Sequence, residues 1–225
     1  MFGELARLGT ATVHEAAGRA AVIDVPLIQV VPGSNAAGPA RTVRCGQDDN
    51  LMVHAAVAEA EPGEVLVLTM PEPRPVALVG ELLATQAKVA GVAALLVDAA
   101  VRDLEELRAL GLPIWARYVR VSGAEKRVPG AIGEPVEVAG ALVRQGDVVV
   151  LDADGAVVVE RERAEEVLES ALVREERERE KREKLEAGEL SYDLDGLREL
   201  VSGVGSTEPP RSGAPALPAR KREDS

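Results

Sequence analysis

Two short polar motifs in the middle of the chain have the residue types of a small-molecule site. Gly80-Glu81 is followed, after residues 82–101, by Arg102-Asp103. Helix formers without proline occupy residues 82–90, and an entirely apolar run follows at residues 92–97. This order predicts a helix and then a buried strand between the two motifs.

The two motifs are therefore expected to lie close together in space. Residues 98–101 are predicted to form a loop, and Asp103 is predicted to open the next helix. Gly80-Glu81 would open the preceding helix. Both motifs would then follow adjacent strands at their carboxyl ends, where open α/β sheets bind ligands.

The chemistry that these residues suit is the binding of a 2-oxo acid. Free backbone N–H groups of Leu82 and Leu83, at the positively polarised start of a helix, would hold a carboxylate together with Arg102. Glu81 and Asp103 supply the hard oxygen ligands that Mg²⁺ or Mn²⁺ prefers. A plainer interpretation stays open, in which Arg102-Asp103 is a loop ion pair and Glu81 a helix-capping acid.

The spacing of an acid and Arg-Asp around this helix and strand resembles the signature of one family. This family comprises the class II 4-hydroxy-4-methyl-2-oxoglutarate / 4-carboxy-4-hydroxy-2-oxoadipate aldolases and the proteins similar to the regulator of ribonuclease E activity A. Further segments resemble the family in the same order along about residues 5 to 200. They are Leu8–Ala16, Gly38–Val43, Asn50 with His54, Pro62–Val67, Pro113–Arg117, Gly146–Gly155 and Arg174–Gly188.

The resemblance implies an α/β fold, a single swivelling β/β/α-type domain with a C-terminal helix and a disordered tail. The boundaries expected are residues 1–160 for the domain, 161–203 for the helical extension and 204–225 for the tail. It also implies a homotrimer or homohexamer in which Glu15 and Glu178 approach the active site of a neighbouring subunit, where they would hold water or relay a proton.

The activity implied by the resemblance is cleavage of a 4-hydroxy-2-oxo acid that carries a further carboxylate. Asp103 and Glu81 would hold Mg²⁺ or Mn²⁺, and Gly80, Leu82, Leu83 and Arg102 would bind the substrate. Arg102 would also stabilise the enolate, and decarboxylation of oxaloacetate is expected as a side activity. Two alternatives remain: a non-catalytic regulatory binding protein, and a lyase or decarboxylase for another 2-oxo acid.

Composition excludes several other classes. The net charge is −12 and the isoelectric point about 4.8, which argues against a nucleic-acid or anionic-membrane surface. Aromatic residues make up only 2% of the chain, which argues against base stacking. The single cysteine, Cys45, suits a reducing cytoplasm and is expected to be a small core residue. Neither the apolar stretch of a secretion signal nor a run of about 18 apolar residues appears, so neither secretion nor a membrane span is expected.

The remaining polar candidates are expected to be structural. His14 and His54 have no partner at metal-binding spacing, so a place in the core or an interface is favoured for both. Asp152 and Asp154 resemble part of a calcium loop, but Asp154-Gly155 favours a tight hairpin turn. Other elements are predicted as helices over residues 4–19, 50–59 and 163–186 and as strands over 22–31, 40–44, 64–70, 114–121, 136–139, 148–151 and 156–159.

Overall fold

The structure, a computed structural model, describes residues 1–19 and 22–204. It divides into two compact units, residues 1–177 and 178–225. The first unit contains the sheets and the site motifs. The second contains the end of α5 (Ala164–Glu186), α6 (Ser191–Leu194) and α7 (Leu197–Val204). Residues 205–225 of the expected disordered tail lie outside the described residues.

The centre of the first unit is a series of strand-helix-strand crossovers. β2, β3, β5 and β6 pair in parallel, and β4 pairs in parallel with the end of β5. The elements follow in the order β2 (Ala36–Arg44), α2 (Leu51–Ala58), β3 (Val65–Thr69), β4 (Ala77–Val79), α3 (Glu81–Val89), β5 (Ala94–Val101), α4 (Leu104–Leu110) and β6 (Ile114–Val119).

β2 joins this parallel region to an antiparallel one. Residues 36–39 pair antiparallel with β10 (Val148–Asp152), whereas residues 40–44 pair in parallel with β3. The main sheet runs in the order β1-β6-β5-β3-β2-β10-β11, with β4 on β5 and β7 on β2. The shorter elements are β1 (Ile28–Gln29), β7 (Ala131–Ile132), β8 (Val136–Val138), β9 (Ala141–Val143), β11 (Gly155–Val159) and the 3₁₀ turn Arg161–Arg163.

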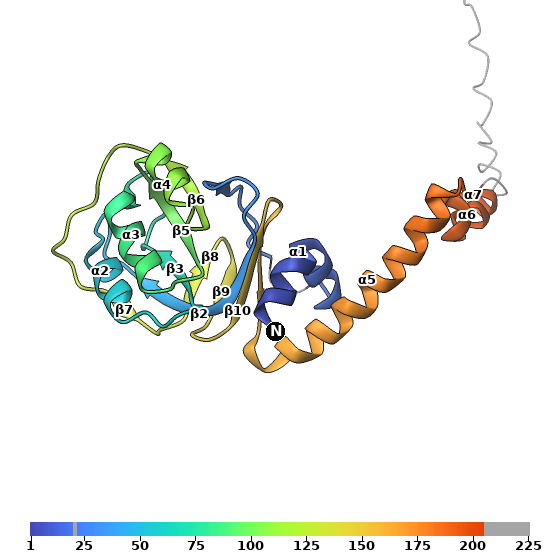
Figure 1. Cartoon of the computed structure of the whole chain (residues 1–225), viewed down its shortest axis with the longest axis horizontal. Coiled ribbons are helices and arrows are strands. Elements are labelled where there is room, and N and C mark those ends of the chain that lie inside the picture. The colour runs from blue at the N-terminus through green and yellow to red at the C-terminus, as the bar shows by residue number, and fades with distance from the viewer. Residues whose placement is uncertain (20–21, 205–225) are drawn as a thin grey trace, which may run out of the picture. The chain divides into compact units, whose positions relative to one another are not determined.

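Three apolar cores separate four layers. The first core lies between α2, α3, α4 and one face of the parallel strands, where Leu66 and Leu95 are buried. The second lies against the other face of these strands, where Trp115 meets the β8-β9 pair and the inner face of β10 and β11. The third lies between the outer face of β10 and β11, α1 (Phe2–Ala16) and the start of α5. Figure 1 shows α2, α3 and α4 grouped on one side and α1 beside β10.

The helices that the site motifs open, and the strand between them, lie close to the positions that the sequence predicts. The helix over residues 82–90, the strand after it and the helix opened by Asp103 are confirmed as α3, β5 and α4. The hairpin turn between β10 and β11 is also confirmed, with Asp152 opposite Gly155. Cys45 is a core residue, and burial raises the pKa of its thiol to about 12.

Two predictions about strands were wrong. Residues 22–31 form only the two-residue β1 and one isolated bridge at Val22. Residues 98–101 are not a loop, because β5 continues to Val101 with every residue buried. Asp98 is tolerated there because Arg117 donates to its carboxylate at 2.6 Å, although burial still raises the pKa of Asp98 against this pairing. The strands β4, β7 and β9 were not predicted.

No helix within residues 1–19 and 22–204 is both long and apolar enough to cross a membrane.

Candidate functional site

The two motifs lie side by side at the carboxyl ends of neighbouring parallel strands, as expected. Gly80 follows β4, Arg102 follows β5, and β4 and β5 pair through Ala77 with Ala100 and Val79 with Val101. The backbone N–H of Arg102 donates to the carbonyl of Val79 at 3.1 Å. The ladder therefore fixes the position of Arg102-Asp103 relative to the start of α3.

Asp103 caps α3 from the neighbouring strand end. Its Oδ2 accepts the N–H of Glu81 at 3.0 Å, while its carbonyl accepts the N–H of Leu107 within α4. Asp103 has φ 61° and ψ 48°, a left-handed conformation that aspartate tolerates better than most residues. Asp103 thus connects two helix starts, α3 through its side chain and α4 through its backbone carbonyl, while an exposed fraction of 42% leaves the side chain open to solvent.

Arg102 lies between two glycines that leave room for it. A Cβ on Gly80 would lie 2.5 Å from Asp103 Oδ2 and 3.2 Å from Arg102 Nε, and a Cβ on Gly123 would lie 2.6 Å from Arg102 Nη1. The guanidinium Nε is 3.8 Å from Asp103 Oδ2, and the Arg102 side chain remains 49% exposed. Any side chain at either glycine would push the guanidinium away from this position.

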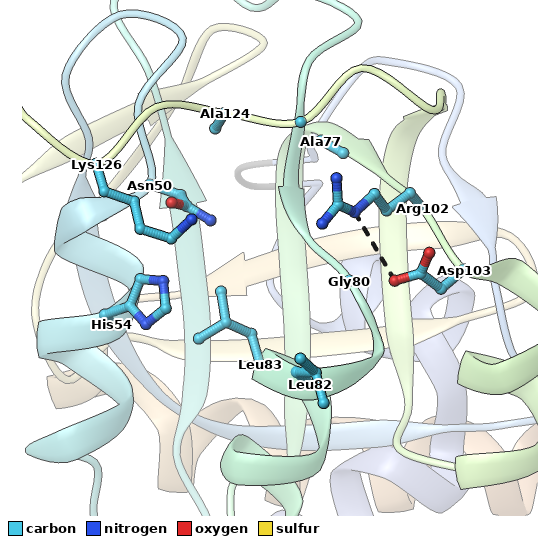
Figure 2. A pocket seen from close by; sticks show the side chains of 11 residues that line it. Asn50, His54, Ala77, Gly80, Leu82, Leu83, Arg102, Asp103, Ala124 and Lys126 are labelled. Carbon is cyan, nitrogen blue, oxygen red and sulfur yellow. Dashed lines mark ion pairs between the residues drawn. The ribbon is translucent and has the colours of Figure 1, made fainter.

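These residues line a cavity of about 250 Å³. Leu82 and Leu83 in the first turn of α3 face it, together with Gly80, Arg102 and Asp103 (Figure 2). The N–H groups of Leu82 and Leu83 are first-turn donors, since the intrahelical ladder of α3 begins with Ala84 donating to Gly80. The cavity therefore combines free backbone donors, a guanidinium and a carboxylate at a volume suited to a small metabolite.

The opposite wall consists of residues for which the sequence pattern predicts no catalytic or binding role. Asn50 and His54 lie one helical turn apart at the start of α2, and Lys126 comes from the loop after β6 (Figure 2). His54 was expected in the core or an interface, but it lines the cavity. Burial, and then the charge of Lys126, lowers the pKa of His54, so its imidazole is neutral at pH 7.

Asp49 holds this wall together. Its carboxylate accepts the N–H of Leu51 at 2.8 Å and the N–H groups of Arg127 and Val128 at 2.6 and 3.0 Å. Burial would raise the pKa of Asp49, but these three backbone donors outweigh it and lower the pKa. The ionised carboxylate therefore ties the Lys126 loop to the start of α2.

The other predicted site residues lie outside the cavity lining. Glu81 turns along α3 and accepts the hydroxyl of Thr85 at 2.9 Å. Glu15, on α1, pairs with Arg19 at 3.4 Å. Glu178 belongs to the second compact unit. The roles assigned to these three carboxylates, as a metal ligand and as groups acting across a subunit interface, stay predictions.

The donor set of a single chain suits a sparsely ligated hard cation. Across residues 1–19 and 22–204, no three His, Cys, Asp or Glu side chains are grouped so as to hold a metal ion. Asp103 is the predicted metal ligand that faces the cavity, and one of its oxygens already serves α3. Mg²⁺ accepts such a site because it keeps most of its waters and binds few protein carboxylates.

Comparison with known proteins defines the family. The family model described as "RraA-like: Aldolase/RraA" matches residues 10–158, which include every residue that lines the cavity. The chain belongs to the RraA-like family. The resemblance drawn from the residues is therefore confirmed, and so is the α/β fold of its first unit.

Individual relatives of this RraA-like chain have two kinds of name. A protein of Halalkalibacterium halodurans named "Putative 4-hydroxy-4-methyl-2-oxoglutarate aldolase" is 38% identical over 134 residues, which are 60% of this chain and 64% of that relative. The chain thus spans less than two thirds of that relative's length. RraAS2 of Streptomyces coelicolor, described as an unusual member of the RNase ES inhibitor RraA protein family, is 31% identical with a TM-score of 0.70, covering 81% of this chain and 96% of RraAS2.

A third likeness bears on the fold alone. The crystal structure of an uncharacterized protein from Pseudomonas syringae is 23% identical, with a TM-score of 0.73 over 84% of this chain and 92% of that protein. Together the relatives indicate that one fold accompanies both an aldolase name and an inhibitor name. The residues of the cavity must therefore distinguish between these two activities.

Proposed function

We propose that this chain is a divalent-metal-dependent lyase that cleaves a 4-hydroxy-2-oxo acid to pyruvate and a second oxo acid. The substrates proposed are 4-carboxy-4-hydroxy-2-oxoadipate and 4-hydroxy-4-methyl-2-oxoglutarate, with oxaloacetate decarboxylation as a side activity. One observation carries the proposal: Arg102 and Asp103 share a cavity with the free N–H groups at the start of α3.

The protein groups have separate roles in this proposal. The N–H groups of Leu82 and Leu83 and the guanidinium of Arg102 bind the 1-carboxylate of the substrate. Arg102 also donates to the 2-oxo oxygen, where negative charge develops as the C3–C4 bond breaks. Asp103 would hold Mg²⁺ or Mn²⁺, with Glu81 joining directly or through water. When bound, the metal would act as a Lewis acid on the carbonyl oxygen.

Assembly completes the proposed site. We place Glu15 and Glu178 near the cavity of a neighbouring subunit of a homotrimer or homohexamer, where they would hold water or relay a proton. Leu82 and Val89 on α3 support a subunit contact beside the cavity, because they are 79% and 84% exposed although apolar. The activity is proposed for the cytoplasm, since the single Cys45 forms no disulfide within the chain.

The main alternative is a regulatory protein that binds a partner and catalyses nothing. The inhibitor description of RraAS2 favours it. The cavity supports the lyase over the regulator, because a regulator that acts by protein contact has no need of a guanidinium and a carboxylate inside one small cavity. A second alternative is a lyase for another 2-oxo acid. Its substrate would bind to the same residues around Arg102 and would differ in the group that faces the opposite wall of the cavity.

The test is pyruvate release from oxaloacetate and from 4-carboxy-4-hydroxy-2-oxoadipate, with Mg²⁺ or Mn²⁺ and then with EDTA. Arg102→Ala and Asp103→Ala are expected to abolish release, and EDTA is expected to do the same. Arg120→Ala is the matched control, since Arg120 is exposed and does not line the cavity. An oligomer that folds correctly but releases no pyruvate from either compound would refute the lyase for these substrates and favour the regulatory role.

A further inference from the structure

The wall of the cavity opposite Arg102 contains buried polar atoms that have no hydrogen-bond partner within residues 1–19 and 22–204. Asn50 is 7% exposed, and its Nδ2 donates to the carbonyl of Leu78 at 2.8 Å. A carbonyl only accepts, so this bond fixes the amide orientation and turns Oδ1 away from Leu78. Oδ1 is buried and has no hydrogen-bond partner among the described residues. An unpaired buried acceptor is costly, which makes it a place where a ligand donor would bind.

His54 presents a second unpartnered atom one turn further along α2. Its Nε2 is buried and makes no hydrogen bond in the part of the chain that the structure describes, and the side chain lines the same cavity. With a proton on Nε2, the neutral imidazole donates one hydrogen bond. Lys126 adds a cation to this wall (Figure 2). The wall therefore offers one acceptor, one neutral donor and one positive charge.

A hydroxycarboxylate satisfies all three groups of this wall. A carboxylate uses Lys126 and His54 but cannot use Asn50 Oδ1, because two acceptors repel. A hydroxyl next to the carboxylate supplies the missing donor to Oδ1. A hydroxyl alone would leave Lys126 without a counter-charge. The dianion of a phosphate monoester would satisfy Lys126 and His54 but offers no proton to Oδ1.

We infer that Asn50, His54 and Lys126 form a subsite for a hydroxycarboxylate end, with the hydroxyl donating to Asn50 Oδ1 and the carboxylate accepting from Lys126 Nζ and His54 Nε2. The assignment rests on the proposed function, because it takes Arg102 and the start of α3 to bind the other end of the same ligand. It makes the opposite wall the part of the site that selects 4-hydroxy-4-carboxy compounds over simple 2-oxo acids.

Backbone hydrogen bonds hold the segments that carry Lys126 and Asn50 next to each other. The N–H of Asn50 donates to the carbonyl of Glu125 at 2.9 Å, and Glu125 donates to the carbonyl of Asp48 at 2.9 Å. The carboxylate of Asp49 adds two further contacts, because it accepts the N–H groups of Arg127 and Val128. The loop that carries Lys126 is therefore held in register with the turn that carries Asn50, and the two side chains face the same ligand group.

The test is equilibrium binding in EDTA, by titration calorimetry, of three ligands that the protein cannot cleave: 2-hydroxyglutarate, glutarate and pentanoate. The affinity is expected to fall from 2-hydroxyglutarate to glutarate, which lacks the hydroxyl, and again from glutarate to pentanoate, which lacks one carboxylate. Each step removes one group that the subsite recognises. Removal of the metal prevents the hydroxy acid from binding as a chelate. It also separates the subsite from catalysis, so a correct ranking with no lyase activity would leave the subsite standing and reject the proposed function.

Substitutions test which residue is responsible for each difference in affinity. Lys126→Ala is expected to weaken glutarate about fivefold or more and leave pentanoate unchanged. Asn50→Ala is expected to remove the preference for 2-hydroxyglutarate over glutarate, and His54→Gln, which can still donate, to keep most of the affinity. Arg127→Ala is the control, because Arg127 is on the same loop and its side chain is 82% exposed. Folding of each variant is checked by circular dichroism.

Three results would overturn the assignment. Equal affinity of wild-type protein for 2-hydroxyglutarate and glutarate would reject recognition of the hydroxyl. The same loss of glutarate and pentanoate binding in Lys126→Ala would mean that Lys126 supports the loop without contacting a carboxylate. No detectable binding of 2-hydroxyglutarate at millimolar concentration would reject the subsite as a whole.

Discussion

The start of α3 and the second half of α1 use the same structural device in two distant regions. α1 is interrupted at Gly9, which has φ 82° and ψ 165°, and resumes at Thr10. Asp152, from the β10-β11 turn, accepts both the N–H and the hydroxyl of Thr10 at 2.7 Å. At α3, Asp103 accepts the N–H of Glu81 in the same manner.

In each region a glycine makes room for the carboxylate. A Cβ on Gly9 would lie 3.0 Å from Asp152 Oδ2, and one on Gly80 would lie 2.5 Å from Asp103 Oδ2. The two carboxylates differ in their surroundings. Asp152 uses its oxygens on backbone and hydroxyl groups of the fold, whereas Asp103 faces a cavity together with Arg102. A carboxylate that caps a helix from another segment is therefore structural by default, and becomes a functional candidate where a cation and open space accompany it.

The largest expected effect separates charge from capping at Asp103. Asp103→Asn keeps an oxygen that accepts the Glu81 N–H but loses the negative charge. Pyruvate release is expected to fall on the order of 10³-fold, while the free energy of unfolding changes by less than about 1 kcal/mol. A coupled assay for pyruvate and a thermal melt measure the two quantities. Retained activity would mean that Asp103, like Asp152, is only a cap.

Gly80→Ala is expected to have the next largest effect on activity. Gly80 has φ −127° and ψ −174°, which alanine adopts freely, so only the contacts with Asp103 and Arg102 oppose the new methyl group. Displacement of these groups is expected to lower kcat/KM about 10²-fold with little change in stability. Steady-state kinetics with oxaloacetate provide the measurement. Loss of stability without loss of activity would contradict the geometry described here.

Asp152→Ala is expected to affect stability and not activity. It removes the acceptor for Thr10 N, Thr10 Oγ1 and Asp154 N, and the free energy of unfolding is expected to fall by about 3 kcal/mol. Urea unfolding measures the change. Asp154→Ala, in the same turn, is the control. A fall in kcat/KM of the folded Asp152→Ala protein matching that of Asp103→Asn would remove the distinction between the two regions.

Gly9→Ala gives a smaller loss with a different cause. The positive φ of Gly9 strains any other residue, and the new Cβ would also meet Asp152 Oδ2. A loss of about 1–2 kcal/mol in unfolding free energy is expected, with activity unchanged. Combined with Asp152→Ala, the two losses should be less than additive, because both disturb one contact. Full additivity would show that they act independently.

The smallest effect concerns a third capping carboxylate, Asp49. Its pKa is lower in the folded chain than in the unfolded chain, so it stabilises the fold above the unfolded pKa and loses this contribution as the pH falls through the folded pKa. The acid-unfolding midpoints of wild type and Asp49→Asn are expected to differ by less than about one pH unit, with the variant less sensitive to acid. An identical pH dependence for both proteins would reject this linkage.

The sequence predicted one wall of the cavity and not the other, for a physical reason. Arg102 and Asp103 lie between a strand and a helix that the local pattern predicts, so their approximate position could be read from the sequence. Asn50 and His54 carried a usable signal, since residues four apart share one helix face. Lys126 carried no such signal, because its position depends on the hydrogen bonds of the Asp49 carboxylate. These bonds connect the loop after β6 to a segment far away in the chain.

The same reasoning explains the errors in the fold. The loop predicted over residues 98–101 begins at Asp98, and an acid seldom occupies a fully buried strand. Only the partner Arg117 on β6 makes it acceptable, and no local pattern reveals that pair. The strands β7 and β9 have two and three residues, too few to show an alternating pattern.

The division of β2 between two partners has a consequence for synthesis of the chain. The half that pairs with β3 can close as soon as β3 has left the ribosome, whereas residues 36–39 wait for β10. Until then their backbone N–H and C=O groups form an open edge that another chain can join. Truncation before β10 is thus expected to yield protein that contains every cavity residue but aggregates, and slow translation of residues 130–147 would prolong the same hazard.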